Sequence, residues 1–256
     1  MLGLVSNAAW TSELFGYRAD FNSKSNPATN FQGNYTLLLP GADDSANGPA
    51  GHGFAQLGVN SGGSVSFKGT LGDGSAAVQK VPLAANGQWP LYVGLYSGKG
   101  SVFGWLTLFN TPTDAVIGPV LWTKPGGVKG PLHPPGFTNE TETLGSRYVA
   151  PASGTRVLDL TSAVVVLDGG NLPATLTNTV ILSERNQVMV DVPNAQKLSI
   201  ALTVSSGSFK GSFVHPQTGK AATLKGVLLQ KQNFSAGFFL GTNQSGRVFL
   251  GELESE

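Results

Sequence analysis

Ser66-Phe-Lys-Gly69 recurs later in the chain as Ser208-Phe-Lys-Gly211. A turn that contains glycine follows each copy, and further matching segments then appear in the same order in both halves of the chain: Ala76-Ala77 with Ala221-Ala222, an aromatic strand at 89–96 with one at 234–240, and Gly100-Ser-Val-Phe103 with Gly246-Arg-Val-Phe249. Self-similarity of this kind is the sequence signature of a repeated structural unit. We therefore predict that one unit is present twice.

The segments around these landmarks alternate between apolar and polar residues and are bounded by Gly, Pro, Asn or Asp. Alternation over short segments predicts β-strands, and such boundaries predict tight turns. Because successive strand residues point to opposite faces, Phe67 and Phe209 should both face a core, in equivalent strands. The fold class is therefore all-β: an antiparallel meander duplicated into a barrel-like or two-sheet arrangement with pseudo-two-fold symmetry. The pattern leaves open whether the copies share one closed barrel or form two.

The predicted organisation has four parts. Residues 1–32 form an N-terminal strand and lead-in, 33–123 the first meander copy, 124–145 a connecting loop and 146–256 the second copy. The loop assignment rests on the Pro- and Gly-rich stretch from Lys124 to Gly136. Long loops in compact domains are often functional.

Composition limits the function classes. Charged residues make up 12% of the 256 residues and the net charge is +1. No cluster of Lys and Arg is present, and such a cluster is what a nucleic-acid surface requires, so no nucleic-acid partner is expected. The absence of cysteine excludes disulfides, a thiol nucleophile and cysteine-ligated zinc.

No segment has the apolar length of a membrane helix, so no membrane span is expected. The first residues, Met1 to Trp10, lack the basic and apolar regions of a signal peptide. Low charge, abundant small polar residues and no cysteine are typical of a secreted or surface module of a bacterium. We expect an extracellular or cell-surface location, with any signal peptide outside this sequence.

A resemblance to a known kind of domain appears at several glycine-containing stretches: Tyr35-Thr-Leu-Leu-Leu-Pro-Gly41, Gly51-His-Gly-Phe54, Gly69-Thr-Leu-Gly-Asp-Gly74, Pro90-Leu-Tyr92 and Gly104-Trp105. Together they resemble an uncharacterised Gly-rich β domain found in C-terminal modules of very large secreted multidomain proteins of environmental bacteria. The resemblance covers about Gly33 to Leu250 and implies extracellular placement in a multidomain parent. It implies no catalytic residues.

Aromatic residues give the first candidate site. Tyr92 and Tyr96 share one face of a predicted strand, and Phe103, Trp105 and Phe109 share one face of the next. With the nearby tryptophans they would make a platform for sugar rings or other flat ligands, and the candidate ligand-binding residues are Trp89, Tyr92, Tyr96, Trp105 and Trp122. The competing interpretation, which we favour, is that these rings fill the core. Trp105→Ala should then destabilise the fold by about 3–5 kcal/mol.

The only histidines, His52, His133 and His215, all lie in turns or loops rich in Gly and Pro. If they converged, they would form a zinc or catalytic site. They lack the short spacings of known metal motifs, and motifs for acyl transfer, zinc proteases and phosphate-binding loops are absent. Three solvated turn histidines are therefore the favoured interpretation.

A second possible metal site lies in Asp43-Asp-Ser-Ala-Asn-Gly48, where Asp43, Ser45 and Asn47 place oxygen atoms at alternate positions before a glycine. This arrangement is how calcium loops begin. The closing glutamate is missing, because position 54 is Phe. A polar turn whose side chains bond their own backbone is therefore favoured, and no cofactor is expected.

These observations favour a non-catalytic binding or adhesion module that is directed at a polysaccharide or another surface ligand. The alternative is a hydrolase with a site assembled from loops, which would use the three histidines with Asp43, Asp44 or Asp73 and a divalent cation. Convergence of the histidines in space would distinguish the two hypotheses.

Overall fold

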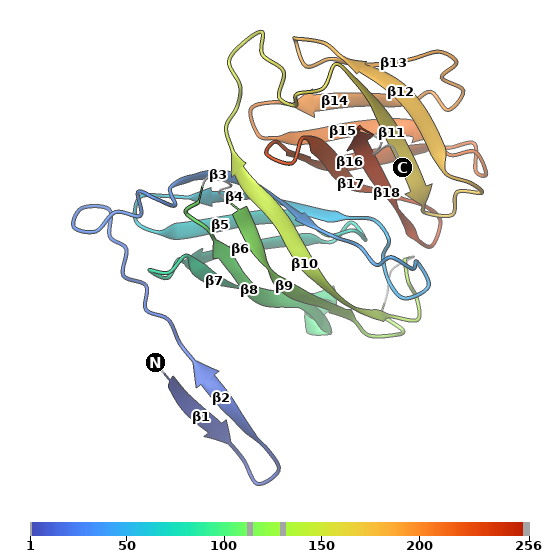
Figure 1. Ribbon diagram of the computed structural model, residues 1–256. Helices are drawn as coiled ribbons and strands as arrows, with labels where there is room; N and C mark the ends of the chain where they lie inside the picture. The colour runs from blue at the N-terminus through green and yellow to red at the C-terminus, as the bar shows by residue number, and fades with distance from the viewer. Residues whose placement is uncertain (1, 112–114, 129–131, 253–256) are drawn as a thin grey trace.

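The computed structural model describes residues 2–111, 115–128 and 132–252. It is an all-β structure with an N-terminal hairpin and two sheets of eight antiparallel strands each (Figure 1). One short 3-10 helix, η1 (Tyr96–Gly98), is the only helix among the described residues. No described helix has the length and apolar character needed to cross a membrane.

The hairpin and the first sheet come from the first 148 residues. The hairpin pairs β1 (Leu2–Ser6) with β2 (Thr11–Phe15). The first sheet, here called the first barrel, contains β3 (Gly33–Leu39), β4 (Gly53–Val59), β5 (Ser64–Thr70), β6 (Ala76–Pro82), β7 (Gln88–Leu95), β8 (Gly100–Leu108), β9 (Ala115–Lys124) and β10 (Phe137–Tyr148). Strands that follow each other in the chain pair, except β6 and β7, and β10 returns to pair with β3, so the meander nearly closes.

The second sheet, here called the second barrel, repeats this plan. It contains β11 (Ser162–Gly169), β12 (Leu176–Leu182), β13 (Val188–Val190), β14 (Ser199–Thr203), β15 (Ser208–Val214), β16 (Ala221–Leu229), β17 (Phe234–Leu240) and β18 (Ser245–Gly251). Its last strand, β18, pairs with its first, β11, and the break in pairing falls between β13 and β14. The predicted duplicated, barrel-like antiparallel meander is therefore confirmed, and each copy forms its own nearly closed barrel.

Each barrel has its own apolar core, which the alternation of side chains produces. In β4 every second residue is buried, as expected for a strand with one face inside. Phe67 packs near Trp89 in the first core, with ring centroids 6.1 Å apart. In the second core, Phe213 and Phe239 meet edge to face at 5.0 Å. Two separate cores explain why the chain divides into two barrels.

The two barrels meet along an apolar contact in which residues of β3 and β4 face β16 and β17. Its buried members are Leu38, Val227, Leu229 and Ala236, with Phe54, Leu144 and Phe234 at the margin. Hydrogen bonds cross the same interface: Thr36 Oγ1 to Leu228 O at 2.8 Å, Gln56 Nε2 to Ser206 O at 2.7 Å and Arg247 Nη2 to Asp43 O at 2.7 Å.

The structure differs from the predicted boundaries at 124–145. The residues 137–145 belong to β10, which continues to Tyr148 and closes the first barrel. The Pro- and Gly-rich stretch before it connects β9 to β10, which are both strands of the first barrel. Its residues 129–131 lie outside the described part of the chain. The connection between the barrels is instead the segment 149–161. The strand escaped prediction because polar residues occupy inward positions: Asn139 and Thr143 are buried and bond to Pro40 O and Gly118 O.

The prediction that the repeated Ser-Phe-Lys-Gly motif lies in equivalent strands is also wrong in part. Phe67 and Phe209 are both buried, as predicted. They do not occupy equivalent strands, because β5 is the third strand of its barrel and β15 is the fifth. A glycine lies beside each ring, but only in the first copy is it the glycine of the motif. A Cβ added at Gly69 would lie 3.0 Å from the Phe67 ring, whereas the Phe209 ring lies 2.3 Å from a Cβ added at Gly226 of β16. A Cβ added at Gly211, the glycine of the second motif, would lie nearest to Ser199 O.

Candidate ligand-binding site

The five aromatic residues predicted to bind ligand separate into two groups. Trp89 and Trp122 are buried in the first core, and Tyr96 is half-buried beside it. Tyr92 and Trp105 point outward from β7 and β8, with 64% and 44% of their surfaces exposed. The core interpretation therefore holds for the two buried tryptophans and fails for Trp105.

Outside the first barrel, Tyr92 and Trp105 join other apolar residues in a shallow groove. In the sheet register Tyr92 lies opposite Phe103, and Phe103 lies opposite Leu121 of β9. The groove has a volume of about 470 Å³, and its remaining side chains include those of Pro90 and Pro119. A mostly apolar, aromatic hollow of this size is typical of sites that bind small organic ligands or single units of a polymer.

The groove rests on two strands that approach unusually closely. A Cβ added at Gly104 would lie 2.1 Å from Pro119 O, and one added at Gly118 would lie 2.1 Å from Trp105 O. Only glycine fits where neighbouring backbones come this near. The glycines therefore fix β8 against β9 and hold the aromatic rings on a rigid sheet, which positions a site more accurately than a loop does.

A few polar groups lie at the groove. Glu140 of β10 lies opposite Leu121 and lines the groove with an exposed carboxylate. The backbone N–H of Tyr92 donates to Gln79 Oε1 at 3.1 Å. Tyr17, from the N-terminal segment, meets Trp105 edge to face at 5.8 Å. The groove thus combines flat apolar rings with a carboxylate that can accept hydrogen bonds from hydroxyl groups.

Tyr96 and Trp122 serve another purpose. The Tyr96 hydroxyl donates to Asp73 Oδ2 at 2.6 Å and accepts from Trp122 Nε1 at 3.1 Å. The Lys124 ammonium lies 5.4 Å from the centre of the Tyr96 ring. Burial, together with the Asp73 carboxylate, raises the pKa of Tyr96 far above its usual value. The phenol therefore stays neutral and holds the end of the barrel together, away from the groove.

The three histidines do not form a ligand set. His52 Nδ1 accepts from the Gly41 N–H at 3.0 Å, and His215 Nε2 lies 3.2 Å from Gly170 O. His133 packs edge to face against Phe137. In the described part of the chain, no group of three or more His, Asp or Glu residues could hold a metal ion.

All three histidines are also less exposed than predicted. His133 and His215 are buried, and His52 is largely so. Burial lowers the pKa of His52 to about 4, assisted by the charge of Arg247. Burial likewise lowers the pKa of His133, with Lys124 adding to the effect. These two rings are neutral structural groups at ordinary pH, and the expectation of solvated turn histidines was wrong.

The segment that resembles a calcium loop folds as a polar turn. Asp44 Oδ1 accepts from the Ala46 N–H at 2.9 Å, and Asp44 Oδ2 accepts from Asn47 Nδ2 at 3.2 Å. The backbone oxygen of Asp43 accepts from Arg247. The side chains of Asp43, Ser45 and Asn47 do not converge with other acidic residues on a cation site among the described residues.

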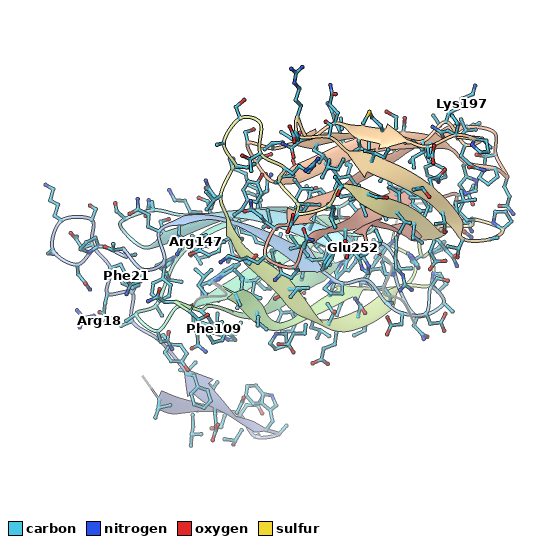
Figure 2. The ribbon with its side chains drawn as sticks, turned by 45° about the horizontal axis from the view of Figure 1, so that its top comes forward. Arg18, Phe21, Phe109, Arg147, Lys197 and Glu252 are labelled. Carbon is cyan, nitrogen blue, oxygen red and sulfur yellow. The ribbon has the colours of Figure 1, made fainter. Side chains whose placement is uncertain are left out.

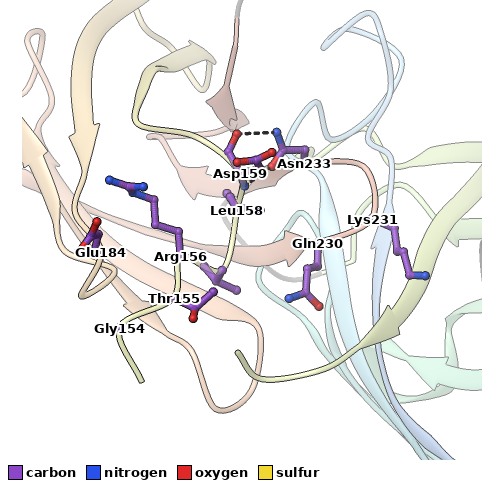
Figure 3. A pocket seen from close by; sticks show the side chains of 10 residues that line it. Gly154, Thr155, Arg156, Leu158, Asp159, Glu184, Gln230, Lys231 and Asn233 are labelled. Carbon is purple, nitrogen blue, oxygen red and sulfur yellow. Dashed lines mark hydrogen bonds between the residues drawn. The ribbon is translucent and has the colours of Figure 1, made fainter. Parts of the chain in front are cut away.

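A larger and more polar pocket, of about 650 Å³, lies beside the segment that joins the barrels (Figure 3). Reciprocal bonds fix its wall: Asn233 Oδ1 accepts from Asp159 N, and Asn233 Nδ2 donates to Asp159 O. Its charged groups have both signs and are dispersed. Figure 3 shows Lys231 on the opposite side of the pocket from Arg156 and Glu184. The aromatic groove is therefore the better organised candidate site.

Sequence reasoning missed part of the groove. Pro119 and Leu121 were not among the candidates, because their closeness to Trp105 depends on strand register. Glu140 was assigned to a loop, although it belongs to β10. The pairing of β8 with β9 was predictable, because the two strands follow each other in the chain. That pairing was the one signal in the sequence that could have placed Pro119 and Leu121 near Trp105.

No protein-family model matches this chain, and no curated protein or solved structure matches it either.

Proposed function

We propose that the protein is a non-catalytic binding module that holds a polysaccharide in the aromatic groove of the first barrel. One observation carries the proposal: Tyr92, Phe103 and Trp105 lie together on a rigid outer sheet face, and each exposes over 40% of its surface. Burying aromatic surface is favourable, so a ligand that covers these rings would gain binding free energy. Clustered apolar side chains on a protein surface often mark such a binding site.

A sugar ring suits this groove better than a purely apolar ligand. One face of a pyranose carries C–H groups that pack on aromatic rings, and its edge carries hydroxyl groups. Glu140 at the groove offers an acceptor for those hydroxyls. The groove is open and lies on a sheet face, so a polymer chain could lie across it. Low charge and the absence of cysteine support an extracellular or surface location for such a module.

Affinity electrophoresis against soluble polysaccharides tests the proposal. Xylan, mixed-linkage glucan, galactomannan and pectin serve as the probes, and insoluble cellulose and chitin are tested by sedimentation. We expect at least one probe to retard the protein, and Trp105→Ala or Tyr92→Ala to weaken binding about fivefold to tenfold, since loss of a stacked ring costs about 1–1.5 kcal/mol.

Phe109→Ala is the matched control. Phe109 has an exposed fraction of 43%, the same as Phe103, but it follows the last residue of β8 and lies outside the groove. Its replacement should leave retardation unchanged. The proposal fails if none of the six probes binds, or if Phe109→Ala weakens binding as much as Trp105→Ala does.

A further inference from the structure

Both histidines of the first barrel lie in loops that touch the second barrel. His52 ends the loop 40–52 between β3 and β4, and His133 lies between β9 and β10. The backbone N–H of His52 donates to Gly237 O at 3.2 Å, and that of His133 donates to Asn243 O at 3.1 Å. Gly237 is in β17, and Asn243 is in the turn from β17 to β18. The two histidines therefore attach the first barrel to one hairpin of the second.

The loop of His52 packs tightly against the second barrel. The Gly51 N–H donates to Ser245 Oγ at 3.2 Å. A Cβ added at Gly51 would lie 2.7 Å from the Phe238 Cβ and 2.9 Å from Gly246 O. Chain segments packed this closely exclude water, so a charge that forms here is poorly hydrated while the barrels stay together.

The His52 ring is held in its neutral form. Its Nδ1 accepts a hydrogen bond from the Gly41 N–H at 3.0 Å, so this nitrogen carries no proton. Arg247 of the second barrel lies beside the same loop, where its Nη2 donates to Asp43 O at 2.7 Å. Burial and the Arg247 charge lower the pKa of His52 to about 4, and the Asp43 carboxylate opposes them only in part. A proton added to Nδ1 would break the bond to Gly41, and the charged ring would repel Arg247.

His133 has the same kind of neighbour. Its ring is buried and packs edge to face against Phe137. Lys124 is also buried, and its Nζ donates to Leu132 O, next to His133 in the chain. Burial lowers the pKa of His133, the Lys124 charge adds to this effect and the Asp73 carboxylate opposes it. Protonation of His133 would therefore also place like charges together in a buried contact.

We propose that acid opens the contact between the barrels. Protonation of His52 and His133 places positive charge beside a basic residue in both loops, and the barrels separate while each keeps its own core. Separation lets water hydrate the charged rings, which the closed contact does not permit. This response to pH goes beyond polysaccharide binding, since neither histidine lines the aromatic groove.

The direction of the response follows from the pKa of the histidines. A histidine that becomes exposed regains its usual pKa of about 6.5, so below that pH the open form binds more protons than the closed form. The contact is therefore fully present above about pH 6.5 and weakens as the pH falls towards about 4. For His52 alone, the equilibrium shifts towards the open form by up to about tenfold for each pH unit in this window.

Energy transfer between two dyes tests the proposal in the full chain, because no native cysteine competes for the labels. Phe109→Cys and Lys197→Cys provide the attachment sites, and Figure 2 shows Phe109 on the first barrel and Lys197 on the second. Both positions are exposed. We expect constant transfer efficiency between about pH 8 and about pH 7, and a fall between about pH 6 and about pH 4.5 while circular dichroism still shows intact β structure. An efficiency that stays constant throughout, or that falls only together with the β signal, overturns the proposal.

Asparagine variants show whether these histidines cause the response. In His52→Asn an amide oxygen can still accept the Gly41 N–H without titrating. His133→Asn suits the φ of 48° at that position, since asparagine tolerates the left-handed region. The double variant should keep its transfer efficiency at about pH 4.5. His215→Asn is the matched control, because His215 is buried within the second barrel against Gly170 O, and its efficiency should still fall. A double variant that opens as the unchanged chain does, or a control that stays closed in acid, overturns the proposal.

Discussion

Trp89 and Trp105 lie on neighbouring strands but on opposite faces of the first barrel. Trp89 is fully buried, and Trp105 is 44% exposed. We expect Trp89→Ala to lower the free energy of unfolding by about 3–5 kcal/mol, through lost burial and a cavity. Trp105→Ala should lower it by less than about 1 kcal/mol, because substitutions at exposed positions usually change stability by about 0.5 kcal/mol or less. Urea unfolding followed by circular dichroism measures both values, and equal losses would contradict the assignment of the two faces.

At the same scale, the sequence predicted which aromatic residues share a face better than it predicted which face is exposed to water. Alternation correctly grouped Phe103 with Trp105. It could not show that this face points outward, since a period of two is the same for both faces. Tyr96 left its predicted face for a local reason. Its φ of 53° lies in the left-handed region, at the start of η1, and there its side chain reaches Asp73 instead of Tyr92.

His52 predicts a dependence of stability on pH. Burial lowers its folded-state pKa from 6.5 to about 4, so between these values the unfolded chain binds a proton that the folded chain does not. Stability is therefore fully present above pH 6.5 and is lost as the pH falls towards 4. The loss is about 3 kcal/mol for a shift of this size.

Urea unfolding at about pH 7 and about pH 4.5 measures this loss. His52→Asn provides the control, because an amide oxygen can accept the Gly41 N–H but does not titrate. Most of the acid-induced loss should disappear in this variant. An unchanged loss would assign the pH dependence to other groups, such as His133, whose pKa is also lowered.

At the scale of the strand, prediction succeeded where the inward residues are apolar. In β4 every second residue is buried, so burial alternates cleanly along the strand. β10 was assigned to a loop because Asn139 and Thr143 point inward, where hydrogen bonds to backbone oxygens replace apolar contacts. Such a strand does not alternate between apolar and polar residues. It is stabilised instead by the backbone oxygens that accept hydrogen bonds from its inward side chains. A hydrogen-bond acceptor that is distant in sequence, such as Pro40 O, cannot be predicted from the residues around Asn139.

The repeated motif shows a related limit. Gly69 of the first motif makes room for the Phe67 ring, whereas the Phe209 ring lies beside Gly226, which is outside the second motif. The motif correctly indicated duplication and the direction of both phenylalanines. It could not assign equivalent strands, because the motif falls in the third strand of one barrel and in the fifth strand of the other.

For the whole molecule, the interface between the barrels determines whether they unfold together. Val227 is fully buried there and belongs to the interface cluster, outside the core of the second barrel. Beside it, Thr36 of the first barrel donates to the backbone oxygen of Leu228. Because buried apolar contacts and hydrogen bonds join the barrels, we expect the full chain to unfold in a single calorimetric transition.

Val227→Asn should uncouple the barrels. It places an amide in an apolar contact, at a cost of about 2–4 kcal/mol from lost burial and an unsatisfied polar group. Scanning calorimetry should then resolve two transitions where the unchanged chain shows one. Val165→Asn is the matched control: Val165 is equally buried but lies in the second core, so its replacement should lower the melting temperature of the second barrel itself. If Val227→Asn leaves one transition with an unshifted midpoint, the contact between the barrels contributes nothing to their cooperativity, and each barrel owes its stability to its own core alone.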